Sequence, residues 1–550
     1  MIVHNIKRLA LIYAIAVSSV LSGCSEGNSI TDKDGGAENS MDGGTDNTSD
    51  DINLSDIGPD CFSDRDNDAS YDAGEAESVD LSDGGVNITD EGTYILSGDM
   101  TSGKIVVNAP GKKVQLVFAG CNITSQNSCP FVIEEADKVF MTLADGSMNT
   151  VSDAASYTET LGDSTVDAAI FSKADLTING GGTLNVTGSY KHGIVSKDDI
   201  TITGGEINVT SVKSGIVGKD CVQIGGGKIN VSAGTHAISS TNEEDKSKGY
   251  VYVYSGDISL DAGKKGIKAI SGLIVDGGTI NVSRSYEGLE STIININGGE
   301  IDIVSSDDGI NASDMYSDGE EQSEGGRHIK AGKPAGENPD EKEDVPAGRM
   351  SGDRKTSEGE RPERDEKMSE RERPDSDGNI HGGGKTDGGM KMPASDNPCD
   401  LTINGGTLNI NASGDGIDSN GTLYVNGGQI YVSGPSSHGN GALDYNGDAV
   451  ITGGTVIAAG SAGMAENFGQ SSTQASLLIR TGSQEKGSTI KVIDSSGNEI
   501  ISWQSPKEYE SVIISSPNLI IGSEYVIEAG DYRETVELTE PALKGKNNSH

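Results

Sequence analysis

The sequence predicts an all-β protein: a right-handed parallel β-helix with three short strands per rung and about eleven rungs, followed by a C-terminal antiparallel β cap. One recurring phrase carries this prediction. A short β-branched strand, a Gly-Gly turn and a second short strand occupy residues 176–186, and the same phrase returns at 200–209. From Gly182 to Gly299, the second glycines of successive turns lie 23, 22, 29, 22 and 21 residues apart. A fixed period of this kind is the signature of a repeat architecture.

The length and pattern of the strands favour a β-helix over other repeat folds. Strands of three to five residues in a period near 22 leave no room for a crossover helix. Isoleucine, leucine and valine alternate with threonine, asparagine and aspartate, so one face of each strand is expected to be buried. Parallel crossovers are almost always right-handed, and rungs stack about 4.8 Å apart. The 77 glycines suit the corners of such a stack, and its thin core does not need bulky aromatic residues.

The N-terminus is interpreted as a lipoprotein signal peptide spanning residues 1–24. Lys7 and Arg8 precede an apolar run at 9–20, which suits a signal peptide and is short for a membrane span. The run ends in Leu-Ser-Gly-Cys24, which resembles the lipobox of bacterial lipoproteins and makes Cys24 the expected lipidation site. The alternative is an ordinary signal peptide with an incidental cysteine. We expect an exported protein, lipid-anchored at the cell surface, that meets the membrane through the lipid alone.

Two segments have compositions typical of disorder. Residues 25–83 are predicted to form an acidic spacer. Residues 314–398 hold seven of the 14 prolines and seven of the 12 arginines, which predicts a disordered insertion or a docking tail for a partner. Across this insertion the second glycines are 107 residues apart, and the spacing then returns to 22 and 26. The insertion is therefore expected to interrupt one stack, with rungs at 84–313 and 399–470.

The remaining residues, 471–550, break the period and predict the cap and a tail. Short strands at 476–479, 511–514 and 524–527 suggest antiparallel pairing, with Trp503 inside the cap. Solenoids need such caps to cover their open ends. Cys121 and Cys129 are close in sequence, and either a disulfide or two thiols is consistent with an exported protein.

The charge balance excludes one class of partner. Lysine and arginine total 41 against 85 aspartates and glutamates, which gives a formal net charge of -44. A field this negative repels phosphate, so we expect no nucleic-acid binding.

Two columns of side chains flank the Gly-Ile corner of successive rungs, and they change from neutral or basic to acidic at Glu287. Carboxylates stacked about 4.8 Å apart repel each other unless a cation lies between them. Ca²⁺ takes six to eight oxygen ligands, and the lack of His and Cys here argues against Zn²⁺. The candidate calcium ligands are Glu287, Glu290, Asp307, Asp308, Asn311, Asp415, Asp418 and Asp444. The alternative is a set of solvated corner residues without a metal.

Basic and aromatic residues just before the acidic columns are candidate ligand-binding residues: Lys264, Lys265, Lys268, Arg284 and Tyr286. A tyrosine can stack on a sugar face. The basic residues also suit a calcium-dependent uronate lyase, in which Arg or Lys removes a proton next to a carboxylate. Arg284 is the only arginine between residues 81 and 313. His192 and His236 are interpreted as polar corner residues rather than as bases or ligands.

The repeats and the corners Ser306–Ala312 and Gly414–Gly421 resemble a bacterial family of carbohydrate-binding parallel β-helix proteins, whose fold is similar to that of pectate lyases. The resemblance covers roughly 84–540. It implies non-catalytic binding of acidic polygalacturonate and cellulose together with Ca²⁺, and it makes Asp308, Asn311, Asp415 and Asp418 calcium candidates. We therefore expect a carbohydrate-binding protein that is not an enzyme. The alternatives are a calcium-dependent pectate lyase and a repetitive surface adhesin that binds no sugar.

Overall fold

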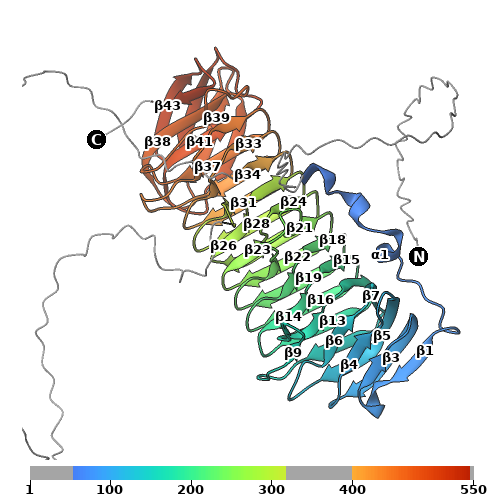
Figure 1. The fold of residues 1–550 in the computed structure, drawn as a ribbon. Helices are drawn as coiled ribbons and strands as arrows, with labels where there is room; N and C mark the ends of the chain where they lie inside the picture. Colours follow the sequence, from blue (N-terminus) through green and yellow to red (C-terminus); the bar gives the residue numbers. More distant parts are fainter. Residues whose placement is uncertain (1–53, 317–398, 546–550) are drawn as a thin grey trace, which may run out of the picture. The chain divides into compact units, whose positions relative to one another are not determined.

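The protein is described by a computed structural model that covers residues 54–316 and 399–545. This part of the chain is almost entirely β-strand, and the strands are arranged largely in parallel sheets (Figure 1). Its helical elements are a few residues long: η1 (Leu54–Asp56), η2 (Pro59–Cys61), α1 (Asp64–Asn67) and η3 (Leu81–Asp83). Within these ranges, no helix has the length and hydrophobicity of a membrane span. The predicted all-β class is confirmed, and so is parallel pairing.

One sheet contains twelve parallel strands in sequence order, with one strand from each repeat. The sequence predicts about eleven repeats. The first repeats are irregularly spaced, so they are harder to count from the sequence than the later ones. The strands are β2 (Val86–Ile88), β4 (Ile105–Asn108), β6 (Phe131–Glu135), β11 (Ala168–Ser172), β14 (His192–Ser196), β17 (Ile216–Gly218), β20 (Ile238–Ser240), β23 (Lys265–Lys268), β26 (Glu287–Ser291), β29 (Ile310–Ala312), β32 (Ile417–Ser419) and β35 (Leu443–Tyr445).

Each later repeat adds two further strands, one on either side of a turn that is Gly-Gly in most repeats, Asp145-Gly146 between β7 and β8, and Ser255-Gly256 between β21 and β22. The strands before the turn are β7 (Lys138–Leu143), β12 (Asp175–Gly180), β15 (Asp199–Ile202), β18 (Cys221–Ile224), β21 (Tyr250–Val253), β24 (Gly272–Val275), β27 (Ile293–Ile296), β30 (Leu401–Ile403), β33 (Leu423–Val425) and β36 (Ala449–Ile451). The strands after the turn are β8 (Met148–Ser152), β13 (Thr183–Gly188), β16 (Glu206–Ser211), β19 (Lys228–Ala233), β22 (Asp257–Ala262), β25 (Thr279–Ser285), β28 (Glu300–Ser305), β31 (Thr407–Ala412), β34 (Gln429–Ser433) and β37 (Thr455–Gly460). Each strand pairs in parallel with its counterpart in the next repeat.

The first repeats are less regular. β1 (Glu77–Asp80) pairs in parallel with β3 (Gly92–Met100), and β3 pairs with the long strand β5 (Lys113–Thr124). The long strand β5 then pairs with both β7 and β8. A single strand therefore stands at the start of both sets of strands that flank the turns. A short hairpin of β9 (Thr160–Leu161) and β10 (Ser164–Thr165) projects from the connection to β11.

The repeating phrase has a clear physical basis in the packing. Ile178, Ile202 and Ile224 stack in register and are fully buried, which forms the thin core. In the turns, the second glycine has a positive φ, as at Gly205 (87°), which side-chain-bearing residues seldom adopt. A Cβ on the preceding Gly204 would lie 2.7 Å from the carbonyl oxygen of Gly180. Glycine is therefore needed here because neighbouring turns stack backbone against backbone.

The predicted acidic spacer at 25–83 differs from the structure in its second half. Residues 54–80 run beside the stack, and their side chains contact it. Leu54 packs with Tyr252 and Ile274, and the Phe62 ring lies 5.8 Å from the Tyr252 ring. A few well-spaced apolar residues are enough to attach a segment whose average composition is that of a spacer. Residues 25–53 lie outside the described residues, as do the signal peptide, Cys24 and nearly all of the predicted insertion.

The C-terminal strands form an antiparallel cap at the positions predicted. β38 (Ser476–Gln484) pairs antiparallel with β41 (Tyr509–Ser515) and parallel with β44 (Ala542–Lys544). β40 (Glu499–Gln504), β39 (Thr489–Asp494), β42 (Glu524–Ala529) and β43 (Tyr532–Glu537) make a four-stranded antiparallel sheet. Trp503 lies on β40 and stacks on Tyr431 of β34, with ring centroids 6.1 Å apart. Cys121 and Cys129 are not joined by a disulfide; each sulfur contacts a backbone carbonyl oxygen.

Candidate cation and ligand site

The corners that precede β29 and β32 bring several predicted carboxylates together. Asp307 and Asp308 lie just before β29, and Asp415 lies just before β32. Ligand oxygens of Glu287, Asp307 and Asp308 lie within 4.8 Å of one another, and so do those of Asp308, Asp415 and Asp418. Asp308 therefore belongs to both groups. The parallel register produces this arrangement, because it stacks equivalent corner positions of adjacent repeats.

Backbone amides hold two of these carboxylates in place. One Asp308 oxygen accepts a hydrogen bond from the Asp415 N–H at 2.7 Å. One Asp415 oxygen accepts from the Gly441 N–H at 2.6 Å. Each bond fixes one carboxylate oxygen, so the acidic side chains are oriented by the backbone of the next repeat rather than by a cationic side chain.

A second column runs through Glu290, Asn311, Asp418 and Asp444, which are paired in register on β26, β29, β32 and β35. Two buried oxygens in this column have no hydrogen-bond partner: Oε2 of Glu290 and Oδ1 of Asn311. The Asn311 amide N–H donates to Glu287 at 3.3 Å, so its carbonyl oxygen is the end left over. A buried oxygen without a donor is costly, and a bound cation or water would satisfy it.

The electrostatics of the corner favour a bound positive charge. Burial, together with the charges of Asp307 and Glu287, raises the pKa of Asp308 to about 9. Burial likewise raises the pKa of Asp415 to about 7, and it raises that of Asp418 well above its usual range. Within the described residues, no ion pair joins a lysine or arginine to these three carboxylates. The carboxylates therefore compete with one another for protons or for a cation.

The donors present suit a hard divalent cation. They are carboxylate oxygens and one amide carbonyl oxygen, with no His or Cys in either group. Ca²⁺ is bound by such oxygens and tolerates irregular geometry. Asp308, Asp415 and Asp418 are the residues best placed to hold it, with Asp307 and Asn311 at the edge. Asp444 lies in neither group and acts on Asp418 and Asp415 through its charge.

Lys265 neutralises the N-terminal end of the acidic columns. Its Nζ lies 2.7 Å from Glu287 and 3.0 Å from Glu290, and all three side chains are buried. Burial alone would lower the pKa of Lys265, but Glu290 and Glu287 outweigh it and raise that pKa. The structure therefore differs from two predictions. Lys265 is a buried internal counter-ion rather than a polysaccharide contact, and Glu290 belongs to this ion triad rather than to either carboxylate group.

The other predicted ligand-binding residues lie around this triad. Tyr286 is 38% exposed, and its ring lies 5.6 Å from the Lys265 ammonium. A hydrogen bond to Asp307 raises the Tyr286 pKa. Arg284 is exposed and pairs with Asp261 through its Nε at 2.8 Å. Lys264 and Lys268 are partly exposed on either side of Lys265. Tyr286 is thus an accessible aromatic edge directly beside the carboxylates.

One acidic group was not foreseen. Three carboxylate oxygens, from Asp175, Asp198 and Asp199, also lie within 4.8 Å of one another. These residues come after β11 and β14, whereas the acidic corner comes before β29 and β32. Burial raises the pKa of Asp198 to about 6. The adjacent aspartates at 198 and 199 were a visible signal, but the partner Asp175 follows only from the register of β12 with β15.

Comparisons with known proteins agree with a role in carbohydrate binding. Residues 82–332 match the family described as carbohydrate-binding domain-containing protein. A protein of that description from Acetivibrio thermocellus is 36% identical over 282 residues, which is 51% of this chain and 91% of the relative. The chain belongs to this carbohydrate-binding domain-containing family. A solved structure, titled a polysaccharide lyase-like protein from C. thermocellum in a gadolinium derivative, is 32% identical and covers 41% of this chain and 92% of its own, with a TM-score of 0.34.

The match to the carbohydrate-binding domain-containing family contains only part of the acidic corner. Residues 82–332 include Glu287, Asp307, Asp308 and Asn311, whereas Asp415 and Asp418 lie beyond them. The repeats on both sides of 317–398 therefore contribute to the corner.

Proposed function

We propose that this protein is a non-catalytic lipoprotein of the cell surface that binds acidic polysaccharide of the polygalacturonate type, and also cellulose, with Ca²⁺ at the acidic corner. We further propose that its parallel stack winds as a right-handed β-helix. Membership of a carbohydrate-binding domain-containing family supports the general role. The observation that carries the specific proposal is the position of Asp308, which lies within 4.8 Å of two sets of acidic ligand oxygens.

Bound Ca²⁺ would offset the electrostatic repulsion between this acidic protein and an anionic polysaccharide. A protein with a net charge of -44 repels an anionic polymer. Ca²⁺ held by Asp308, Asp415 and Asp418 would reverse the local sign, and uronate carboxylates can supply further oxygen ligands because calcium accepts six to eight. The exposed ring of Tyr286 beside the corner offers a surface for a sugar ring.

The state of two of the candidate basic residues, Lys265 and Arg284, supports binding rather than lyase chemistry. A lyase needs a basic side chain that can lose its proton next to the substrate. Lys265 is buried between two glutamates that raise its pKa, and Arg284 is paired with Asp261. Neither is available as a base at the acidic corner.

Affinity electrophoresis through polygalacturonate tests the proposal. We expect retention in the presence of Ca²⁺, weaker retention in chelator, and no absorbance from unsaturated uronate products. Asp308→Ala combined with Asp415→Ala should lose both calcium and retention. Asp163→Ala combined with Asp257→Ala removes the same number of carboxyl groups from exposed positions and should leave both unchanged.

Three outcomes would contradict the proposal. Unchanged calcium content and retention in the Asp308/Asp415 variant would show that the site lies elsewhere. Formation of unsaturated uronate would establish lyase activity. Absence of retention on every acidic and neutral glycan would favour an adhesin. Anchoring is tested separately, since Cys24→Ala should move the protein out of the membrane fraction.

A further inference from the structure

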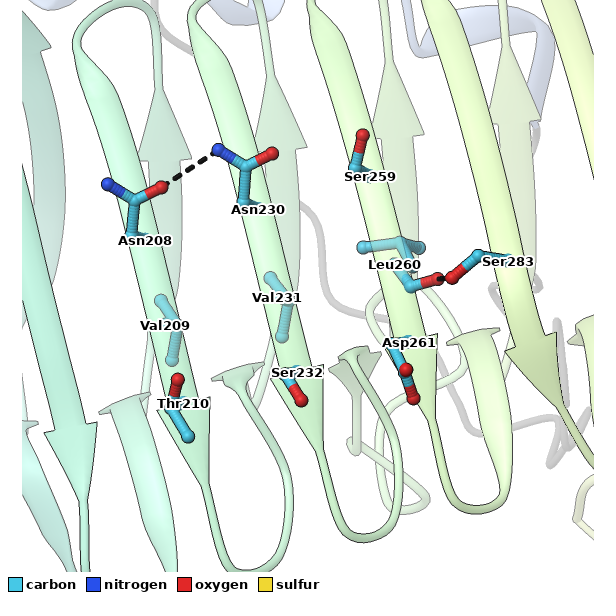
Figure 2. A pocket seen from close by; sticks show the side chains of 10 residues that line it. All are labelled: Asn208, Val209, Thr210, Asn230, Val231, Ser232, Ser259, Leu260, Asp261 and Ser283. Atoms are coloured by element: carbon cyan, nitrogen blue, oxygen red, sulfur yellow. Dashed lines mark hydrogen bonds between the residues drawn. The ribbon is translucent and has the colours of Figure 1, made fainter.

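The outer face of β16, β19, β22 and β25 carries a shallow hollow of about 230 Å³ (Figure 2). Polar side chains line it from four successive repeats: Asn208, Thr210, Asn230, Ser232, Ser259, Asp261 and Ser283. The hollow lies on the strands that follow the Gly-Gly turns, whereas the acidic corner lies at the start of β29 and β32. It is therefore a separate feature of the surface.

The hollow arises where a ladder of asparagines is interrupted. Asn208 donates to the Asn185 side-chain oxygen at 3.0 Å, and Asn230 donates to Asn208 at 2.8 Å. The next residue in register is Ser259, and the ladder position after that is Asn281. Because serine is shorter, space opens beside Asn230, and the carboxamide oxygen of Asn230 faces that space in Figure 2.

A β-bulge closes the far side of the hollow. The register between β22 and β25 shifts after Leu260, so that Asp261 lies opposite Arg284. The Ser283 hydroxyl donates to the Leu260 carbonyl oxygen at 3.0 Å, and the Arg284 Nε donates to Asp261 at 2.8 Å. Bulges reorient side chains and are frequent beside functional sites. Here the bulge pairs the only arginine of residues 81–313 with Asp261, which lines the hollow.

Most side chains that line the hollow are polar and the lining is locally neutral in charge, although Val209, Val231 and Leu260 contribute apolar surface. Asp261 compensates the charge of Arg284. Among the described residues, no hydrogen-bond partner is found for the hydroxyls of Thr210, Ser232 and Ser259. Hydroxyl, carboxamide and paired ionic groups along one row can exchange hydrogen bonds with sugar hydroxyls, and an anionic chain gains no net attraction from them.

We propose that this hollow binds a neutral polysaccharide chain, independently of the calcium-bearing corner. The ligand lies against Ser259, hydrogen-bonds to the free oxygen of Asn230 and meets the Asp261–Arg284 pair at its end. This inference rests on the proposed role in glycan binding, and it assigns the neutral ligand to a place of its own.

Ser259→Asn tests the site by continuing the asparagine ladder. The new side chain would fill the space between Asn230 and Asn281 and continue the side-chain hydrogen bonding of the asparagine ladder. Folding should therefore be preserved. Retention by hydroxyethylcellulose, xyloglucan and galactomannan is measured by affinity electrophoresis, with the melting temperature of each variant. The polymer that retains the wild type should retain the Ser259→Asn variant about tenfold more weakly, because one or two hydrogen bonds are lost. Calcium-dependent retention by polygalacturonate should not change.

Ser255→Asn is the matched control, because Ser255 is exposed in the turn of the same repeat and does not line the hollow. It should behave as the wild type does. The inference fails if Ser259→Asn retains wild-type binding, or if the wild type binds none of the three neutral polymers. Wild-type binding by the Ser259→Asn variant would overturn the location of the site alone. Absence of binding to all three neutral polymers would also contradict the proposed binding of cellulose, whereas loss of calcium-dependent binding to polygalacturonate would overturn the calcium-dependent part of the proposed function and leave this inference standing.

Discussion

Asp308 occupies the most crowded position of the acidic corner, because it neighbours Glu287 and Asp307 on one side and Asp415 and Asp418 on the other. Burial of its side chain, and then the charges of these neighbours, raise the pKa of Asp308. The sequence was sufficient to identify this residue, since the repeat period aligns Asp308 with Asp415. It was not sufficient to place Lys265 correctly. Lys265 and Glu287 occupy equivalent positions in adjacent repeats, and opposite charges in register attract each other.

The acidic corner should make stability depend on pH. In the folded chain, the pKa of Asp308 is raised from 3.8 to about 9 and that of Asp415 from 3.8 to about 7. At a pH between the usual and the raised pKa of each group, the folded chain therefore binds more protons than the unfolded chain. Stability contributed by these groups therefore falls as the pH rises through this window. In chelator, we expect a lower melting temperature at about pH 8 than at about pH 5.

Calcium should remove much of this dependence, because it binds the deprotonated carboxylates. Its addition is expected to raise the melting temperature more at the higher pH. Differential scanning calorimetry of Asp308→Asn with Asp415→Asn tests the assignment, since the variant lacks two of the groups whose pKa values are raised and should therefore depend less on pH. Identical pH profiles for the variant and the wild type in chelator would count against the assignment.

At the scale of elements, the segment before β1 acts as a strap along the stack. Asp66 is 1% exposed, lies 2.7 Å from the Lys138 ammonium and accepts a hydrogen bond from Thr177. Small residues underneath accommodate the strap: a Cβ on Gly225 would lie 3.0 Å from the Phe62 ring, and a Cβ on Gly272 would lie 2.3 Å from Leu54. Sequence reasoning missed this element because its anchors are single residues separated by Asp, Ser and Gly.

Removing the central anchor should detach the strap while the stack remains folded. Asp66→Ala leaves the Lys138 ammonium without its buried partner, which we expect to destabilise the strap by about 2–4 kcal/mol. Hydrogen exchange followed by mass spectrometry should show faster exchange at 54–68 and little change in β18 or β24. Asp68→Ala is the control, because the Asp68 side chain is about half exposed. Equal exchange in both variants would mean that Asp66 is not the anchor.

At the scale of the whole molecule, the stack continues in register from one side of the predicted insertion to the other. Ile294 pairs with Leu401, and Glu300 with Thr407, although these residues are more than a hundred positions apart in sequence. The repeat period was therefore a strong predictor of the parallel sheets. The pairwise details of the acidic corner depend on side-chain burial, which periodicity does not specify.

Replacing residues 317–398 with a linker of about four residues should leave the stack intact. The strands on either side already pair directly, so no register change is needed. Circular dichroism and the melting temperature should match those of the full chain, and calcium binding should persist because its ligands are retained. A substantial fall in melting temperature would show that the segment contributes to the fold.

The manner in which β37 ends the stack has a consequence for self-association. On one side β37 pairs in parallel with β34, and on the other it pairs antiparallel with β41. An uncovered parallel strand would be a template on which another copy could polymerise, as in amyloid growth. β41 of the same chain pairs antiparallel with this edge of β37, so the edge is not open to another copy. A protein built from interchangeable repeats thereby has a defined length.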